Sequence, residues 1–185
     1  MLLDFFPQTL LHLLAGLDAP TSGRIEWPAL GPPDRLRPGP IGFAFQGPSL
    51  LSPLTVLENV ALPLLLLDRE EREANEASAG LLERLRLTDV ADKLPEELSG
   101  GQLQRAGLAR ALVGGPALVL ADEPTGQQDR ETGRLVVDVL LDEAGRSGAA
   151  IVVATHDRTV AERLSKRWEL VNGRLLNQEV APSSS

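Results

Sequence analysis

The chain has 185 residues, which suits one globular domain with a sizeable core, and 43% of its residues are hydrophobic. A formal net charge of −8, with no cluster of lysine and arginine, argues against a surface that binds nucleic acid. The absence of cysteine excludes disulfides and thiolate metal sites, and two histidines are too few for a histidine-built zinc centre. The cytosol is the compartment that this composition suits.

The apolar segments of the chain do not predict a signal peptide or a membrane span. Asp4 interrupts the N-terminal apolar stretch, and the first positive residue is Arg24. The longest apolar run, Val60–Leu67, is far shorter than the ~20 residues that a spanning helix needs, and it contains Pro63. Any contact with a membrane is therefore expected through a partner.

The first half of the chain predicts a helix, two short strands and then a helical insert. An apolar helix is expected over Thr9–Leu17, ended by Gly16, and strands over Arg24–Trp27 and Ile41–Phe45. Residues from about 47 to 115 change character and predict a helical subdomain. The first helix of this subdomain is expected to begin at Thr55. The second begins at Asp68-Arg-Glu-Glu71, which has capping-box spacing, and ends near Leu87. The third runs from Ser99 to Gly114.

The second half alternates strands and helices, which predicts parallel βα units. The expected elements are strand Ala117–Ala121, helix Asp129–Arg146, strand Ala149–Ala154, helix Asp157–Lys166, and a hairpin of Trp168–Val171 and Arg174–Leu176 around Asn172-Gly173. One domain over residues 1–177 is expected, followed by a frayed tail over 178–185.

Ser99-Gly-Gly-Gln102 is the most informative stretch. Ser99 as N-cap and Gln102 three residues later form a capping box, so the stretch is explained structurally as a helix start. A helix N-terminus also binds anions through its free N–H groups, and glycines at positions 100 and 101 let a phosphate approach closely. Both interpretations predict a helix that begins here.

Asp122 and Glu123 follow a hydrophobic strand. Acids are common where a buried strand reaches solvent, but the carboxyl end of a parallel strand is also where open α/β sheets bind ligands. Paired acids at such an end are a usual place for Mg²⁺ and a polarised water.

These two segments together resemble the signature sequence and the Walker B strand of the ATP-binding cassette ATPases. Residues on either side of these segments extend the resemblance, because they occur in the order expected of the family. Gln46 follows an apolar run, Asp129 follows the two acids, and His156 follows a strand. The likeness runs from Thr9 to about Leu176. Three segments are similar to the subfamily that powers lipoprotein release and macrolide export: Leu10–Asp18, Leu51–Val60 and Asp122–Gly126.

The resemblance implies an α/β fold, in which helices flank a mostly parallel P-loop NTPase-like sheet with an inserted helical subdomain. It implies ATP and Mg²⁺ as cofactors, with Asp122 and Gln46 as residues that hold the metal. Glu123 would be the base for the attacking water, and His156 would stabilise the γ-phosphate. Gln46 and Asp129 are also implied as nucleotide-binding residues, Asp129 at an inter-subunit contact, although Gly126-Gln-Gln-Asp129 departs from the commoner Ser-Ala-Leu-Asp.

In this family each nucleotide lies between two subunits. The resemblance therefore implies that Ser99, Gly100, Gly101 and Gln102 contact the γ-phosphate held by the P-loop of a second ATPase subunit, identical or different. It also implies membrane permease subunits as partners, no nucleic acid, and a cytoplasmic protein held at the inner face of the cell membrane through the permease.

The P-loop, G-x-x-x-x-G-K-[ST], does not occur in the 185 residues, nor do the strands that precede it in the family. Phe6, Pro7 and Gln8 fill the positions of its glycine, lysine and serine, and neither Lys93 nor Lys166 lies in a glycine turn. Proline supplies no N–H, phenylalanine blocks close approach, and glutamine has neither the ammonium charge nor the hydroxyl.

Three interpretations follow from this pattern. The chain could be a transporter ATPase subunit that lacks its N-terminal portion, or a non-hydrolysing subunit that supplies its signature motif to a partner ATPase. A cassette ATPase for DNA repair or translation ranks last, because a basic surface and a tandem second cassette are missing.

Overall fold

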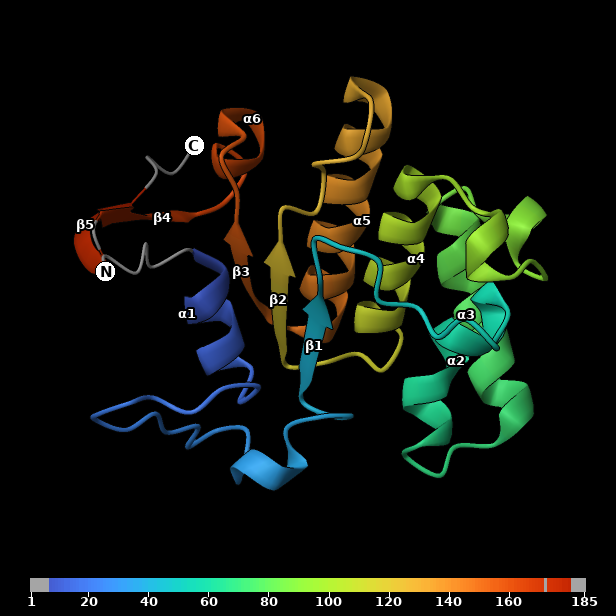
Figure 1. Cartoon of the computed structure of the whole chain (residues 1–185), viewed down its shortest axis with the longest axis horizontal. Helices are drawn as coiled ribbons and strands as arrows, with labels where there is room; N and C mark the ends of the chain where they lie inside the picture. The colour runs from blue at the N-terminus through green and yellow to red at the C-terminus, as the bar shows by residue number, and fades with distance from the viewer. Residues whose placement is uncertain (1–6, 172, 181–185) are drawn as a thin grey trace.

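The computed structural model describes residues 7–171 and 173–180 of the chain (Figure 1). Its centre is a three-stranded sheet of β1 (Ile41–Ala44), β2 (Leu118–Asp122) and β3 (Ala150–Ala154), in the order β1-β2-β3. Both pairings are parallel, and the register matches Ala44 with Ala121 and Asp122 with Ala154. The three carboxyl ends therefore lie at one edge of the sheet, and the predicted α/β fold class is confirmed.

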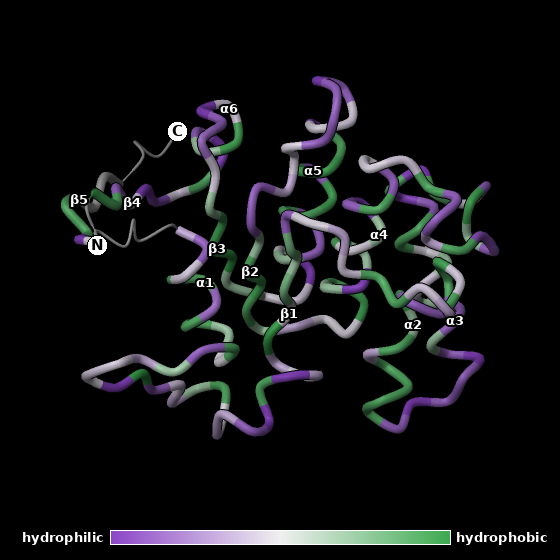
Figure 2. The backbone as a smooth tube through the Cα atoms, in the orientation of Figure 1, coloured by the Kyte–Doolittle hydropathy of each residue, from purple (hydrophilic) through white to green (hydrophobic). Residues whose placement is uncertain are grey.

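Helices cover both faces of this sheet. Helix α1 (Pro7–Leu14) packs on one face, where Leu11 and Ala15 join Phe43 and Leu120 in a buried cluster. Successive strand residues point to opposite faces, so Val119 and Ala121 join the larger cluster beneath α4 (Gly100–Leu112) and α5 (Arg130–Ser147). Hydrophobic stretches accordingly follow the central strands, while hydrophilic stretches lie toward the periphery (Figure 2).

Three helices gather at one end of the molecule, beside β1 (Figure 1). Helix α2 (Val56–Leu65) starts at the predicted cap Thr55, and its capping box with Glu58 is complete. Helix α3 (Glu71–Arg84) packs on α2, and both pack on α4 (Gly100–Leu112). Short 3₁₀ turns lie at Pro33–Arg35, Thr88–Val90 and Pro95–Glu97.

The C-terminal third continues the alternation. Helix α5 (Arg130–Ser147) has Asp129, the predicted start of this helix, as its N-cap, and its C-cap is Gly148, whose φ of 70° suits glycine. A four-residue helix, α6 (Arg158–Ala161), follows β3, and the antiparallel hairpin of β4 (Lys166–Val171) and β5 (Arg174–Val180) comes after it.

Three predicted elements differ from the structure. Arg24–Trp27 is not a strand, because no strand among the described residues pairs with it; Trp27 instead donates its indole N–H to the Leu14 carbonyl at 2.9 Å. The predicted capping box at Asp68 is wrong, since Asp68 has φ +58° in the turn after α2 and Glu70 is the N-cap of α3.

The predicted helix Asp157–Lys166 is also wrong beyond Ala161. The helix starts where it was predicted, with Asp157 as its N-cap, but Lys166 pairs with Val180 in the hairpin, which takes the chain out of the helix. Strand β5 includes residues 178–180, which the sequence placed in the tail, while 181–185 and Phe6 lie outside the described residues. Within the described ranges no helix has the length and apolar character needed to cross a bilayer.

Candidate functional site

The candidate site is built at the carboxyl edge of the parallel sheet. Asp122 is the last residue of β2 and Glu123 follows it, while Thr155 and His156 follow β3. Gln46 is exposed two residues beyond β1, at the same edge. This edge is the position at which open α/β sheets bind ligands.

The Glu123 carboxylate is held by contacts to Thr155 and His156. One oxygen accepts the backbone N–H of His156 at 2.9 Å, and the other accepts the hydroxyl of Thr155 at 3.0 Å. The Nδ1 atom of His156 lies 2.6 Å from the first oxygen. The Glu123 side chain is 16% exposed and that of His156 is 86% exposed, so the pair presents a sheltered carboxylate and an open imidazole.

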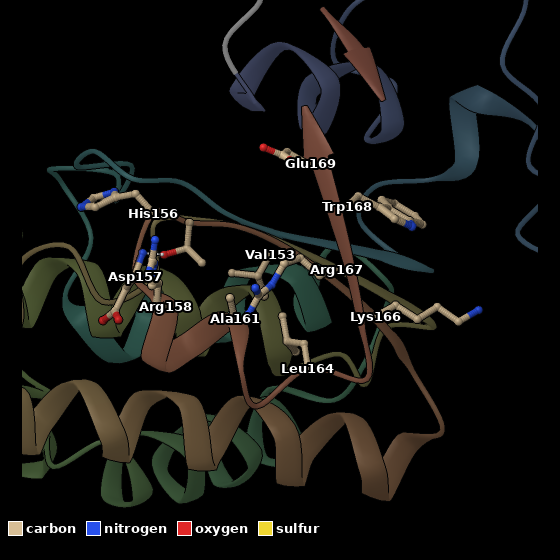
Figure 3. A pocket seen from close by; sticks show the side chains of 11 residues that line it. Val153, His156, Asp157, Arg158, Ala161, Leu164, Lys166, Arg167, Trp168 and Glu169 are labelled. Atoms are coloured by element: carbon tan, nitrogen blue, oxygen red, sulfur yellow. Dashed lines mark hydrogen bonds between the residues drawn. The ribbon is translucent and has the colours of Figure 1, made fainter. Parts of the chain in front are cut away.

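His156 stands at the rim of an open pocket of about 360 Å³ between β3, α6 and β4 (Figure 3). His156 and Asp157 lie at one end of the pocket, and β4 carries Lys166 and Trp168 along its other side. An exposed imidazole beside a carboxylate can donate or accept a proton toward a bound group.

Asp122 is buried, with 5% of its surface exposed, and its Oδ2 atom has no hydrogen-bond partner within the described residues. Burial raises the pKa of this carboxyl, and the neighbouring charge of Glu123 raises it further, while His12 lowers it. A sheltered carboxylate oxygen without a partner fits a cation. Mg²⁺ in phosphate sites is held by one or two carboxylates, waters and phosphate oxygens, which suits Asp122 with Gln46 nearby.

The other candidate region is the N-terminus of α4. Ser99 accepts the backbone N–H of Gln102 at 3.3 Å, and the Gln102 side chain accepts the N–H of Ser99 at 2.9 Å, so the predicted capping box is confirmed. Ser99 and Gly100 are exposed. The remaining N–H groups of the first turn have no helical partner and are available to an anion.

The two glycines also have a reason within this chain. A Cβ atom on Gly100 would clash with the side-chain oxygen of Gln127, and one on Gly101 would lie 2.9 Å from the backbone carbonyl of Gln127. The turn between β2 and α5 therefore packs directly on the start of α4.

Asp129 caps α5. Its carboxylate accepts the backbone N–H groups of Glu131 and Thr132 and the hydroxyl of Thr132, at 2.9, 3.0 and 2.7 Å. These bonds with Thr132 lower the pKa of Asp129. The geometry explains Asp129 as a helix cap, and a nucleotide-related role for it stays a prediction.

The structure brings some predicted residues together and keeps others apart. Glu123 and His156 meet, as do Ser99 and Gln102, but no hydrogen bond among the described residues joins one pair to the other. A single chain thus carries two separate groups of residues, Glu123 with His156 and Ser99 with Gln102, and each group is called a half-site below. At the P-loop position, Pro7 and Gln8 are exposed at the start of α1 and supply no cation.

Sequence reasoning missed Gln104 and Gln128, which connect α4 to the turn after β2. Gln104 is 7% exposed and donates to the Glu123 carbonyl at 2.7 Å, while Gln128 donates to the Gly101 carbonyl at 2.9 Å. The available signal was a polar residue on an apolar helix face, because position 104 lies one helical turn before the apolar Leu108. Thr155 was missed as well, and its place beside Glu123 follows from the strand register.

The chain is similar to a known protein family and to curated proteins. A family model described as ABC transporter matches residues 8–126. The lipoprotein-releasing system ATP-binding protein LolD of Legionella pneumophila (strain Paris) is 42% identical over 178 residues, which cover 92% of this chain and 78% of that protein. The LolD protein of Xanthomonas campestris pv. campestris (strain 8004) is 42% identical over 183 residues, covering 95% and 76%.

Solved structures with the same fold include the dimeric post-hydrolysis state of the ATP-binding cassette MJ0796 bound to ADP and Pi. It superposes with a TM-score of 0.87 at 34% identity and covers 96% of this chain and 81% of that one. The structure of cbiO1 from Clostridium perfringens, part of the ABC transporter complex cbiONQ, gives a TM-score of 0.77 at 27% identity and covers 95% and 72%.

Proposed function

The chain belongs to the ABC transporter ATPase family, and from this premise we propose that it is the ATP-binding subunit of a transporter, coupling ATP hydrolysis to movement of a substrate through a membrane permease. The observation that carries the proposal is the sheltered Glu123 carboxylate held against His156, next to the unpartnered oxygen of Asp122. The LolD relatives favour lipoprotein release as the transport process.

The residues at the sheet edge divide the chemistry between them. Glu123 would accept the proton of the attacking water, since its carboxylate is fixed by Thr155 and His156. His156 would donate to the terminal phosphate from its exposed ring. Asp122 and Gln46 would hold Mg²⁺, which supplies charge neutralisation of the phosphates when it is bound.

Residues 1–185 do not fit ATP by themselves, because the sequence contains no G-x-x-x-x-G-K-[ST] motif to hold the phosphates. Pro7 lacks an N–H and Gln8 lacks the cation and the small hydroxyl. Each lost charge-assisted hydrogen bond is worth about 1.5–3 kcal/mol, and about 4 kcal/mol separates micromolar from millimolar affinity. A homodimer of these 185 residues is therefore not expected to hydrolyse ATP.

A permease partner is supported by an apolar groove beside β1. The groove has a volume of about 400 Å³ and is lined by residues of β1, α2 and α4, Arg110 among them, together with Arg37. Leu51 and Leu66 on its rim are 46% and 61% exposed. Contiguous exposed apolar surface is typical of an interaction site, and docking there would hold the protein at the inner face of the membrane.

The second candidate function is that of a non-hydrolysing subunit, which supplies Ser99–Gln102 to the P-loop of a partner ATPase. This candidate is favoured because the capping box at Ser99 is complete, whereas Pro7 and Gln8 occupy positions at which a P-loop needs a cation and a small hydroxyl. Both candidates use the same half-sites, and they differ only in whether nucleotide binds beside Glu123.

A graft tests the hydrolytic proposal. A segment that carries a strand and a Gly-Lys-Ser turn replaces the residues before Thr9, and steady-state ATPase activity is measured. Turnover is expected to appear, and Glu123→Gln should abolish most of it while nucleotide stays bound, because the amide keeps the shape but accepts no proton. Full turnover in Glu123→Gln would show that Glu123 is not the base.

A further inference from the structure

Glu123 has an unusual backbone conformation for a residue proposed to act on a water. Its φ of +46° lies in the left-handed region, which is unfavourable for a residue with a Cβ atom. Its N–H donates to the Ala154 carbonyl at 2.8 Å, which fixes the entry to the turn from the side of β3. A conformation of this kind persists only where the surroundings over-determine it.

Gln104 supplies the contact on the other side of the turn. Its Nε2 atom donates to the Glu123 carbonyl at 2.7 Å, and its Oε1 atom accepts the backbone N–H of Gln127 at 3.2 Å and the Nε2 of Gln128 at 3.0 Å. The Glu123 carbonyl also accepts the N–H of Gly126 at 3.0 Å. The buried Gln104 amide thus forms hydrogen bonds with Glu123 at the start of the turn and with Gln127 and Gln128 at its end.

We propose that Gln104 is a positioning residue, whose amide holds the left-handed backbone of Glu123 and thereby aims its carboxylate at His156. The amide is suited to this task because it offers a donor to a carbonyl and an acceptor to an N–H at once. Glutamate at this position would keep the acceptor and lose the donor. The catalytic consequence of this positioning rests on the proposed function, but the geometry itself does not.

The same contacts extend to the start of α4. Gln128 donates to the Gly101 carbonyl at 2.9 Å and accepts from Arg105 at 2.7 Å. Gln104 and Gln128 therefore tie the helix that begins at Ser99 to the turn that begins at Glu123. In a dimer that places each nucleotide between two chains, this tie links the half-site offered to the partner with the half-site of the chain itself.

The two histidines of the chain make the proposal testable without nucleotide. In ¹H–¹³C spectra of the full chain at one pH, the imidazole signal of His156 reports its contact with Glu123, and that of His12, which lies 5.5 Å from the Phe43 ring, serves as internal reference. Glu123→Gln defines the displacement that follows loss of the carboxylate charge.

Gln104→Met, which keeps length without hydrogen bonds, should move the His156 signal through most of that displacement and leave His12 in place. Gln128→Met is the matched control, because it spares the bond from Gln104 to Glu123 and should leave His156 unmoved. If Gln104→Met fails to fold, Gln104→Glu keeps the acceptor, replaces the donor by a carboxyl oxygen, and should also displace the His156 signal.

An unmoved His156 signal in the Gln104 variant, an equal displacement in Gln128→Met, or a shift of both histidines would each overturn the positioning role. Because no nucleotide is present, such a result would leave the proposed ATPase function standing, and failure of the graft would leave the positioning role standing.

Discussion

The Nδ1 atom of His156 lies 2.6 Å from a carboxylate oxygen of Glu123, although 33 residues separate them in the chain. The parallel register of β2 and β3, which pairs Asp122 with Ala154, places both residues just beyond the strand ends. The pair is therefore set by sheet hydrogen bonds and does not depend on the path of a long loop.

The 185-residue chain is expected to show no Mg-ATP site of micromolar affinity in calorimetric titration. The reason is that Pro7 and Gln8 occupy positions at which a phosphate cradle needs N–H groups, a cation and a small hydroxyl. The chain carrying the Gly-Lys-Ser graft is the control and should bind. Saturable micromolar binding by the ungrafted chain would contradict this explanation.

Asp122→Asn should stabilise the protein at pH 7. The pKa of Asp122 is raised by burial, so its contribution to stability is fully present below its ordinary value of 3.8 and is lost as pH rises through the folded-state pKa. The variant should have a higher melting temperature at pH 7, by about 2–4 °C for each kcal/mol of unfavourable buried charge that the substitution removes. The difference in melting temperature between variant and parent should become smaller toward pH 4. A difference that does not vary with pH would exclude the buried charge as its cause.

Asp129→Asn is the control with the opposite sign. Hydrogen bonds from Thr132 lower the pKa of Asp129, so this carboxylate contributes stability above its ordinary value of 3.8 that is lost as pH falls through the folded-state pKa. The variant should melt lower at pH 7 and approach the parent only in stronger acid.

Gly101→Ala should destabilise the protein by roughly 1–3 kcal/mol, because its Cβ meets the backbone carbonyl of Gln127 at 2.9 Å. Gly100→Ala should be nearly neutral, since the clash is with the flexible end of the Gln127 side chain. Gly80 in α3 has open space around it, and Gly80→Ala should stabilise by about 0.5–1 kcal/mol. Chemical denaturation measures all three, and equal losses at positions 100 and 101 would contradict the packing argument.

Local signals in the sequence predicted most of the frame. Thr55, Ser99 and Asp129 were predictable as caps because the cap and its partner lie within three residues. The strands of the central sheet were predictable from short apolar runs, and the family resemblance is confirmed by the match over residues 8–126. Arg24–Trp27 shows the limit, since β-propensity makes a strand only where another strand offers its edge.

The details of the candidate site depend on tertiary contacts that no local pattern encodes. The left-handed φ of Glu123 follows from bonds to Ala154 and Gln104, which belong to a distant strand and a distant helix. The close approach of Gln127 to Gly101 likewise appears only when α4 packs beside the turn. Sequence spacing identified which residues belong to the half-sites, and packing determined how each half-site is held.

Complementation between two disabled chains tests most directly whether this chain can complete a partner's nucleotide site. The grafted chain carrying Ser99→Arg has a phosphate cradle but a blocked helix N-terminus, so it should be nearly inactive alone. Adding the ungrafted chain should restore ATP hydrolysis, because its Ser99 end is exposed and intact. An ungrafted chain with Glu123→Gln should restore it equally, and one with Ser99→Arg should not. Rescue that required Glu123 of the added chain and ignored its Ser99 would contradict the account.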